Sequence, residues 1–235
     1  MTLSSIPQGG QAVVIGATGA IGQACLNHLE ASQRFEAVHG FGRRTDPAVE
    51  VTDEASIEAA AQSIAANGPL RLLLVASGHL HDDSHKPEKS WRSLDASGLA
   101  HAFAVNATGP ALVMKHFLGL FPRDGKAVCA VISAKVGSIG DNHIGGWYGY
   151  RASKAALNQF LKTASIELGR KRSDAICVAL HPGTVASPLS APFAKDGLTV
   201  RDPAQAAGDL LSVIDTLTPA DTGGFRSYDG TILPW

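Results

Sequence analysis

Short apolar runs alternate with segments of helical periodicity along most of the chain. The runs are Ala12–Ile15, Ala37–Phe41, Leu72–Ala76, Ala127–Ser133 and Ala175–Leu180. Between them, apolar residues recur at three- and four-residue spacing, for example over 57–66, 99–118 and 155–168. Strands that are apolar on both faces and alternate with helices predict a parallel sheet. We therefore expect an α/β fold, a doubly wound parallel sheet with helices on both faces, in a single Rossmann domain spanning residues 1–235.

The pattern is least regular between residues 182 and 202, where Pro, Ser, Ala and Gly are frequent. Helical periodicity resumes at Pro203, a residue that suits the first turn of a helix. Irregular segments of this length inside a compact domain are usually functional. We expect residues 186–202 to form a lid over a substrate site.

Composition narrows the class of protein and its partners. Hydrophobic residues make up 45% of the chain, charged residues 17%, and the formal net charge is −1. This balance predicts a globular protein and offers no basic surface for nucleic acid or an anionic membrane. Cys25, Cys129 and Cys177 lie far apart in apolar segments, as buried free thiols do. With no apparent signal peptide or membrane span, we expect a cytoplasmic protein that acts on small molecules.

A glycine-rich turn follows the first predicted strand and opens the first predicted helix. Glycines in this context let the backbone approach a pyrophosphate, whose charge is met by free N–H groups at the helix N-terminus. The alternative is a tight turn that serves only helix packing. We expect a dinucleotide site that includes Gly16, Thr18, Gly19, Ala20, Ile21 and Gly22.

The end of the second predicted strand favours NADP(H) over NAD(H). Arg43 and Arg44 stand where a carboxylate would bind the ribose hydroxyls of NAD. Two guanidiniums can instead bind a 2′-phosphate, although each arginine could also be an ordinary solvated side chain. We expect the adenine near Glu50 and Val51.

Tyr150 and Lys154 are four residues apart at the start of a predicted helix, so their side chains share one face. A tyrosine has an ordinary pKa of about 10, and acid–base chemistry near neutrality requires a nearby cation to stabilise the phenolate. Lys154 can supply that charge. Such a pair is also common on protein surfaces, so the spacing alone leaves both interpretations open.

With these landmarks in order, the chain resembles the short-chain dehydrogenase/reductase family over nearly its whole length. The landmarks are the glycine turn, Val105-Asn106-Ala107-Thr108-Gly109, a serine near the end of the fourth strand, Tyr150-x-x-x-Lys154 and His181-Pro182-Gly183-Thr184-Val185. Gly137-Ser138-Ile139, Asn142, Gly145-Gly146, Tyr150–Asn158, Gly223-Gly224-Phe225 and Tyr228-Asp229-Gly230 are similar to the branch of C-factor and sniffer-type carbonyl reductases.

The resemblance implies a role for each landmark. Tyr150 would donate the proton to a carbonyl, Lys154 would lower the pKa of Tyr150 and bind the nicotinamide ribose, and Asn106 would hold a relay water. An asparagine inside a helix can also simply satisfy buried backbone groups. The remaining cofactor residues implied are Ala76, Ser77, Gly78, Pro182, Gly183, Thr184, Val185 and Ser187. Helices 99–118 and 155–168 form a dimer interface in many relatives, so a homodimer or homotetramer is expected.

The chain departs from the family pattern at its catalytic serine. The usual Ser-Ser pair reads Ser133-Ala134 here, so alanine stands at the expected position. Ser133 would point to the other face of a regular strand, and Ser138 could enter the site from the loop. We take both as candidate catalytic residues. Val75-Ala76-Ser77-Gly78 also replaces the family's usual Asn-Asn-Ala-Gly.

His79, His81 and His85 cluster after Gly78, and imidazoles are common zinc ligands. Their spacing matches no standard zinc pattern. We therefore expect no metal, but a solvated loop with His79 at the edge of a pocket.

Two functions follow from the sequence. The first is an NADP-dependent oxidoreductase that transfers hydride between the nicotinamide and a carbonyl or alcohol, with aldehyde or ketone reduction as the favoured direction. The second is a weakly catalytic or non-catalytic NAD(P)-binding signalling or redox-sensing protein of C-factor type, suggested by Ala134.

Overall fold

The computed structural model describes residues 3–193 and 199–235, which contain six strands and six α-helices. The strands are β1 (Gln11–Ile15), β2 (Ala37–Phe41), β3 (Leu70–Val75), β4 (Ala127–Ile132), β5 (Ala175–His181) and β6 (Gly224–Ser227). The helices are α1 (Ala20–Ser32), α2 (Glu54–Ala65), α3 (Ala96–Phe103), α4 (Gly109–Phe117), α5 (Tyr148–Lys171) and α6 (Pro203–Thr216). Elements of both kinds alternate along the chain, as the apolar pattern predicted.

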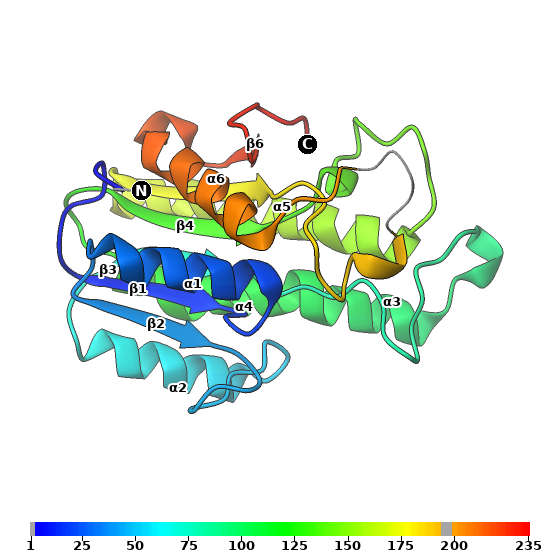
Figure 1. Ribbon diagram of the computed structural model, residues 1–235, viewed down its shortest axis with the longest axis horizontal. Helices are drawn as coiled ribbons and strands as arrows, with labels where there is room; N and C mark the ends of the chain where they lie inside the picture. Colours follow the sequence, from blue (N-terminus) through cyan, green and yellow to red (C-terminus); the bar gives the residue numbers. More distant parts are fainter. Residues whose placement is uncertain (1–2, 194–198) are drawn as a thin grey trace.

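The six strands form one parallel sheet in the order β2-β1-β3-β4-β5-β6. Helices α1 and α6 cover one face, and α2, α4 and α5 cover the other (Figure 1). The order reverses between β1 and β3, because the chain crosses from β2 back over β1. Ligands bind at such a switch point, beyond the carboxyl ends of the strands. The prediction of a single doubly wound Rossmann domain is confirmed.

Alternate strand residues build the two halves of the core. On β1, Val13 and Ile15 pack with α2, α4 and α5, whereas Ala12 and Val14 pack with α1 and α6. All five residues of β1 are buried, which explains why the strand reads as a continuous apolar run. The free cysteines Cys25, Cys129 and Cys177 are buried in these layers, as expected.

The structure differs from the sequence prediction in two elements. The helix expected over 99–118 is divided into α3 and α4 by a π-helical turn, Ala104–Thr108, which carries Asn106. Strand β6 was not predicted, because Gly224–Ser227 is short and only alternate residues of it are buried. Figure 1 shows α3 beyond the carboxyl ends of the strands, on the side where the site is built.

Within the described part of the chain, the helices are too short or too polar to cross a membrane.

Candidate functional site

The glycine turn joins the end of β1 to the start of α1. The backbone N–H groups of Gly16 and Ala17 both donate to the carbonyl of Phe41, at the end of β2. Gly16 has a φ of +86°, and a side chain there would meet the backbone of Ala76 and Ser77 at 2.8 Å. A side chain on Gly22 would lie 2.2 Å from the carbonyl oxygen of Gly16. The turn therefore requires glycine for packing and leaves the N-terminus of α1 open to an anion.

Arg43 and Arg44 follow the end of β2, next to the glycine turn in the case of Arg44. The Arg44 guanidinium donates to the carbonyl of Thr18 at 3.3 Å, and Arg43 lies 3.8 Å from the carboxylate of Glu50. The Arg43 side chain is 81% exposed, so it is free to meet a further anion. Val51 is buried against Gly109, at the start of α4. The structure therefore places the Arg44 guanidinium against the glycine turn, with Arg43 exposed beside it in the chain.

The segment Ser77–Gly78, which follows β3, lies between the glycine turn and the helix α5. The hydroxyl of Ser77 is buried without a partner among the described residues. A side chain on Gly78 would lie 3.7 Å from both the Asn106 amide oxygen and the Lys154 amine. The space beside Gly78 and the unpartnered hydroxyl of Ser77, together with the glycine turn, suit a dinucleotide that runs across the ends of β1 and β3.

Tyr150 and Lys154 lie on the first two turns of α5. The Lys154 amine is 5.9 Å from the centre of the Tyr150 ring and donates to the carbonyl of Ile132 at 2.9 Å. Burial raises the pKa of Tyr150 to about 12 and lowers the pKa of Lys154 to about 8. The expectation that Lys154 lowers the pKa of Tyr150 is therefore wrong for this structure, because burial outweighs the nearby amine, and near neutrality the phenol keeps its proton. Lys154 is 2% exposed, so the interpretation of this pair as a surface pair is wrong.

The loop after β3 is bound to the π-helical turn by Asn106. Its amide oxygen accepts from the His79 N–H at 2.7 Å, and its amide nitrogen donates to the His79 carbonyl at 2.8 Å. The same nitrogen donates to the hydroxyl of Ser153 on α5 at 3.1 Å. Asn106 therefore does satisfy the hydrogen-bonding groups of the His79 backbone, and it joins the loop after β3, the π-helical turn and α5. Its role in a proton relay stays a prediction.

The hydroxyls of both candidate serines are hydrogen-bonded to other groups of the protein. The Ser133 hydroxyl donates to Asn158 at 2.7 Å, two turns along α5 from Tyr150. The Ser138 hydroxyl donates to the carbonyl of Trp235 and accepts from the Asp141 N–H. Both residues are 2% exposed. These contacts give each serine a structural role, and a catalytic role for either stays a prediction without geometric support.

The turn after β5 is held by Arg201, which the sequence analysis did not single out. Gly183 has a φ of +76°, and a side chain there would meet Arg201 at 2.9 Å. The Arg201 guanidinium donates to the Pro182 carbonyl, pairs with Asp209, and lies 3.6 Å from the centre of the Tyr228 ring. Backbone hydrogen bonds also join Arg201 to Thr184 and Ala186. These bonds fix the start of the segment that contains Val185 and Ser187.

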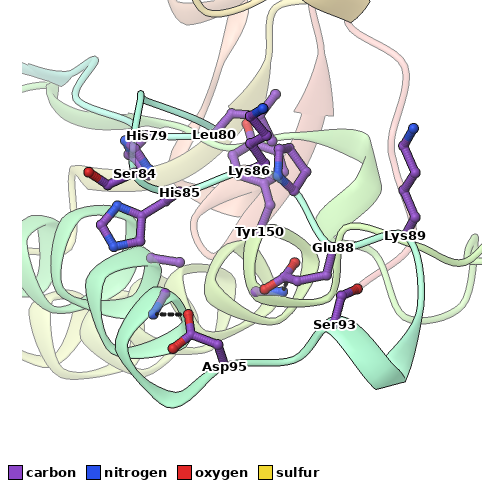
Figure 2. Close-up of a pocket in the computed structure, with 14 residues that line it drawn as sticks. His79, Leu80, Ser84, His85, Lys86, Glu88, Lys89, Ser93, Asp95 and Tyr150 are labelled. Atoms are coloured by element: carbon purple, nitrogen blue, oxygen red, sulfur yellow. Dashed lines mark hydrogen bonds between the residues drawn. The ribbon is translucent and has the colours of Figure 1, made fainter.

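A cavity of about 470 Å³ reaches Tyr150 from the side of α3. Its lining comes from the loop after β3, from α3 and from the start of α5. Figure 2 shows Tyr150 between His79 and His85 on one side and Glu88 on the other. The expectation that His79 borders a pocket is confirmed. The cavity is where a substrate would approach the phenol.

Glu88 orders the start of α5, and nothing in its sequence context indicated this. Its carboxylate accepts from the Gly149 N–H at 3.1 Å, and its carbonyl accepts from the Trp147 N–H at 2.6 Å. Trp147 adopts a left-handed backbone conformation, with a φ of +53°. Glu88 therefore supplies a helix cap from a loop that lies far away in the sequence.

Aromatic contacts join the first part of the expected lid to the start of α5. The Phe193 ring lies 5.0 Å from the Trp147 ring and 5.3 Å from the His81 ring, measured between centroids. The Trp147 ring in turn lies 6.2 Å from Tyr150. Residues 194–198 of the expected lid lie outside the described residues. The contacts of Phe193 place the first part of that segment next to the candidate catalytic tyrosine.

Comparisons with known proteins agree with this geometry. A family model described as enoyl-(acyl carrier protein) reductase matches residues 17–211. The chain is 34% identical to 1-hydroxy-2-glutathionyl-2-methyl-3-butene dehydrogenase of Rhodococcus sp. (strain AD45) over 83% of this chain and 81% of that protein. It is 35% identical to C-signal of Myxococcus xanthus over 60% of this chain and 81% of that protein.

Solved structures show the same fold. The NADPH-bound carbonyl reductase from chicken fatty liver matches with a TM-score of 0.85 and 26% identity, covering 97% of this chain and 95% of that one. The carbonyl reductase Sniffer of D. melanogaster matches with a TM-score of 0.83 and 22% identity, over 97% and 100% of the two chains, which shows the fold alone. The chain therefore belongs to the short-chain dehydrogenase/reductase family of oxidoreductases.

Proposed function

We propose that this oxidoreductase reduces an aldehyde or ketone with NADPH, with Tyr150 as the proton donor. One observation carries the proposal: Tyr150 lies at the end of a cavity with Lys154 behind it, at the edge of the sheet where the glycine turn opens. NADPH, when bound, would supply the hydride. The same residues would serve alcohol oxidation in the reverse direction.

Each residue has a defined task in this proposal. Tyr150 holds its proton at Oη near neutrality, because burial raises its pKa to about 12, and releases it to the carbonyl oxygen as negative charge develops there. Lys154, as a cation, stabilises the phenolate that remains. The exposed guanidiniums of Arg43 and Arg44 would bind a 2′-phosphate, which favours NADP(H) over NAD(H).

Two similarities support the choice of reaction. The Rhodococcus relative is named a dehydrogenase, and the chicken protein is a carbonyl reductase with NADPH bound. The residues that would hold the cofactor here come from the glycine turn, the Ser77–Gly78 strip and the Pro182–Val185 turn, at the ends of β1, β3 and β5. Their placement along one edge suits an extended dinucleotide.

The test is NADPH oxidation with a panel of aldehydes and ketones. Tyr150→Phe should lower kcat by roughly 100-fold or more, as removal of a general acid does, while NADPH affinity measured by fluorescence stays within about twofold. Tyr148→Phe, on the same helix turn, is the matched control and should retain activity. Equal activity of wild type and Tyr150→Phe would refute the assignment.

A second candidate is an NADP-binding protein with weak catalysis. It is favoured by Ala134 at the usual position of the catalytic serine and by the engagement of Ser133 and Ser138 with other partners. C-signal is among the relatives. Ala134→Ser should then raise kcat by about tenfold or more, because a hydroxyl donor to the carbonyl would be restored. NADPH binding with little or no turnover on any carbonyl in wild type, together with a clear gain of turnover in Ala134→Ser, would support this candidate over the enzyme.

We also propose a homodimer or homotetramer that pairs through α4 and α5. Phe160 and Ile166 on α5 are 46% and 51% exposed, a large apolar contribution for a solvent-facing helix. Phe160→Glu combined with Ile166→Glu should shift the protein to a monomer in light scattering. A wild-type monomer would overturn this proposal.

A further inference from the structure

Four side chains with metal-binding atoms meet beside the cavity, and two of them, His79 and His85, line it. They are His79, Asp82 and His85 from the loop after β3, and His101 from α3. One ligand atom from each lies within 4.8 Å of the others. The spacing of the loop histidines in the sequence, even with Asp82 and Asp83 nearby, predicted no metal. The fold adds His101, which reaches the cluster because α3 packs beside the loop.

The Asp82 carboxylate is the centre of the cluster. It lies 3.0 Å from His85 Nδ1, and 3.9 Å from the Nε2 atoms of both His79 and His101. Metal bonds of about 2.0–2.2 Å in a tetrahedron separate neighbouring ligand atoms by roughly 3.3–3.6 Å. The measured separations bracket that edge length. Small side-chain rotations would therefore place four ligands around one ion.

Main-chain hydrogen bonds hold Asp82 in position. Its Oδ1 atom accepts from the N–H groups of Ser84 and His85 at 2.8 and 2.7 Å, and the Asp82 N–H donates to the His85 carbonyl at 2.9 Å. The loop is therefore a closed turn around the carboxylate. Such a turn fixes the direction of two ligands before an ion arrives, which reduces the entropic cost of binding.

The imidazoles crowd one another in a way that a metal would explain. The rings of His85 and His101 stack at 4.7 Å with an interplanar angle of 7°, and the rings of His79 and His101 meet edge-on at 4.5 Å. The side chains of His79 and His85 are 15% and 28% exposed. Imidazole nitrogens that face one carboxylate at these separations are suitable ligands for a divalent cation.

We propose that His79, Asp82, His85 and His101 form a binding site for a divalent transition metal of the zinc class. Three imidazole nitrogens and one carboxylate oxygen favour zinc over magnesium or calcium, which prefer oxygen ligands. A set of four protein ligands is the arrangement of closed, structural zinc sites. The ion would fasten the loop after β3 to α3.

The location connects this site with catalysis. The backbone of His79 is bonded twice to the Asn106 amide, and Asn106 is bonded to Ser153 on α5, three residues from Tyr150. His79 and His85 also line the cavity together with Tyr150 (Figure 2). A bound ion would therefore stiffen the cavity wall and the Asn106 contact without touching the reacting atoms.

The test measures zinc binding to the full chain, free of any affinity tag. Titration with Zn²⁺ alone, in competition with a chromogenic chelator, should give one ion per chain with a Kd below about 10 μM, in the range of protein metal sites. Co²⁺ should give the visible absorption bands of four-coordinate cobalt with nitrogen and oxygen ligands. Zn²⁺ should raise the melting temperature by several degrees.

Variants separate this site from adventitious binding. His101→Gln and His85→Gln should each weaken Zn²⁺ binding by about 100-fold and abolish the zinc-dependent melting shift, because each removes a ligand. Their melting temperatures without metal should match wild type. His143→Gln, at an exposed position, is the control and should bind as wild type does.

Two results would overturn the proposal: a Kd of wild type above about 1 mM, or binding that is unchanged in His101→Gln. A metal-free melting temperature far below that of wild type would show that a variant is misfolded. In that case the Co²⁺ spectrum of wild type decides, since an octahedral, all-oxygen spectrum would exclude imidazole ligation. None of these measurements uses catalysis, so they stand apart from a failure of the reductase proposal.

Discussion

The two sides of the site are built by different means. On the cofactor side, the glycine turn is bonded to β2 by main-chain groups and passes directly between β1 and α1. On the substrate side, long loops are held by single side chains, namely Asn106 and Glu88, and Arg201 fastens the base of the segment after Val185 to the turn at Pro182. A sheet edge fixes the first side, whereas individual polar contacts fix the second. The substrate side can therefore change without disturbing the fold.

The strongest test of this comparison is Gly22→Ala. The new methyl group would lie 2.2 Å from the Gly16 carbonyl, so the turn would have to shift. We expect NADPH affinity to fall by roughly 100-fold, corresponding to about 3 kcal/mol of overpacking, together with a lower melting temperature. Gly119→Ala, where no atom lies within 4 Å of the new methyl group, should leave both unchanged. Similar effects for the two variants would contradict a rigid cofactor side.

Arg43→Ala combined with Arg44→Ala tests the electrostatic part of the cofactor side. Loss of two charge-assisted contacts should lower NADPH affinity by roughly 10- to 100-fold. NADH, which lacks the 2′-phosphate, should bind with unchanged affinity and serves as the internal control. Fluorescence titration with each cofactor gives both numbers. A parallel loss for NADH would show that the arginines support the turn itself.

Burial of Lys154 makes the stability of the protein depend on pH. The pKa of Lys154 is about 8 in the folded protein and 10.5 ordinarily, so between these values the unfolded chain binds the extra proton. Its contribution to the free energy of unfolding therefore rises from pH 8 to pH 10, by about 2 kcal/mol. Tyr150 opposes this above pH 10, because its pKa of about 12 lets the folded protein keep a proton that the unfolded chain loses.

Denaturant unfolding at pH 8 and pH 10 measures this effect, with Lys154→Met as the reference that lacks the titrating amine. Wild type should gain free energy of unfolding relative to the variant over that range. A constant difference between the two proteins would mean that Lys154 is not desolvated.

The smallest expected effect comes from Arg201→Gln on the substrate side. The variant loses the ion pair with Asp209, the hydrogen bond to the Pro182 carbonyl and the contact with the Tyr228 ring, which are worth about 1 kcal/mol each. We expect a several-fold rise in KM for the carbonyl with little change in melting temperature. Asp209→Asn is the control, since it leaves the Arg201 contacts with Pro182 and Tyr228 in place. A large loss of stability would show that this segment supports the fold as the cofactor side of the site does.

The same division explains what could be predicted from the sequence. Strands β1 to β5 and the glycine turn follow from local patterns, because buried parallel strands are continuously apolar and a turn at a positive φ requires glycine. The pairing of Tyr150 with Lys154 follows from helix periodicity. Each of these features depends on residues that are close in the chain.

Features that depend on distant residues were not predicted. His101 meets Asp82 only after α3 packs beside the loop, and the π-helical turn that separates α3 from α4 has no periodicity signal. Glu88 reaches the start of α5 across a long stretch of sequence. The hydrogen bond from Ser133 to Asn158 shows the same limit, since alternation along β4 gave the face of the serine but not its partner.

The backbone hydrogen bonds of Arg201 to Thr184 and Ala186 have a consequence for how substrate preference can diverge among related proteins. These bonds hold the two ends of the intervening segment together. The entropic cost of closing a flexible loop grows only logarithmically with length, by about 0.6 kcal/mol for each doubling. Insertions and deletions between the two residues should therefore cost the fold little. Length variation in this one segment offers the family a means to reshape the substrate site while β5 and α6 stay in register.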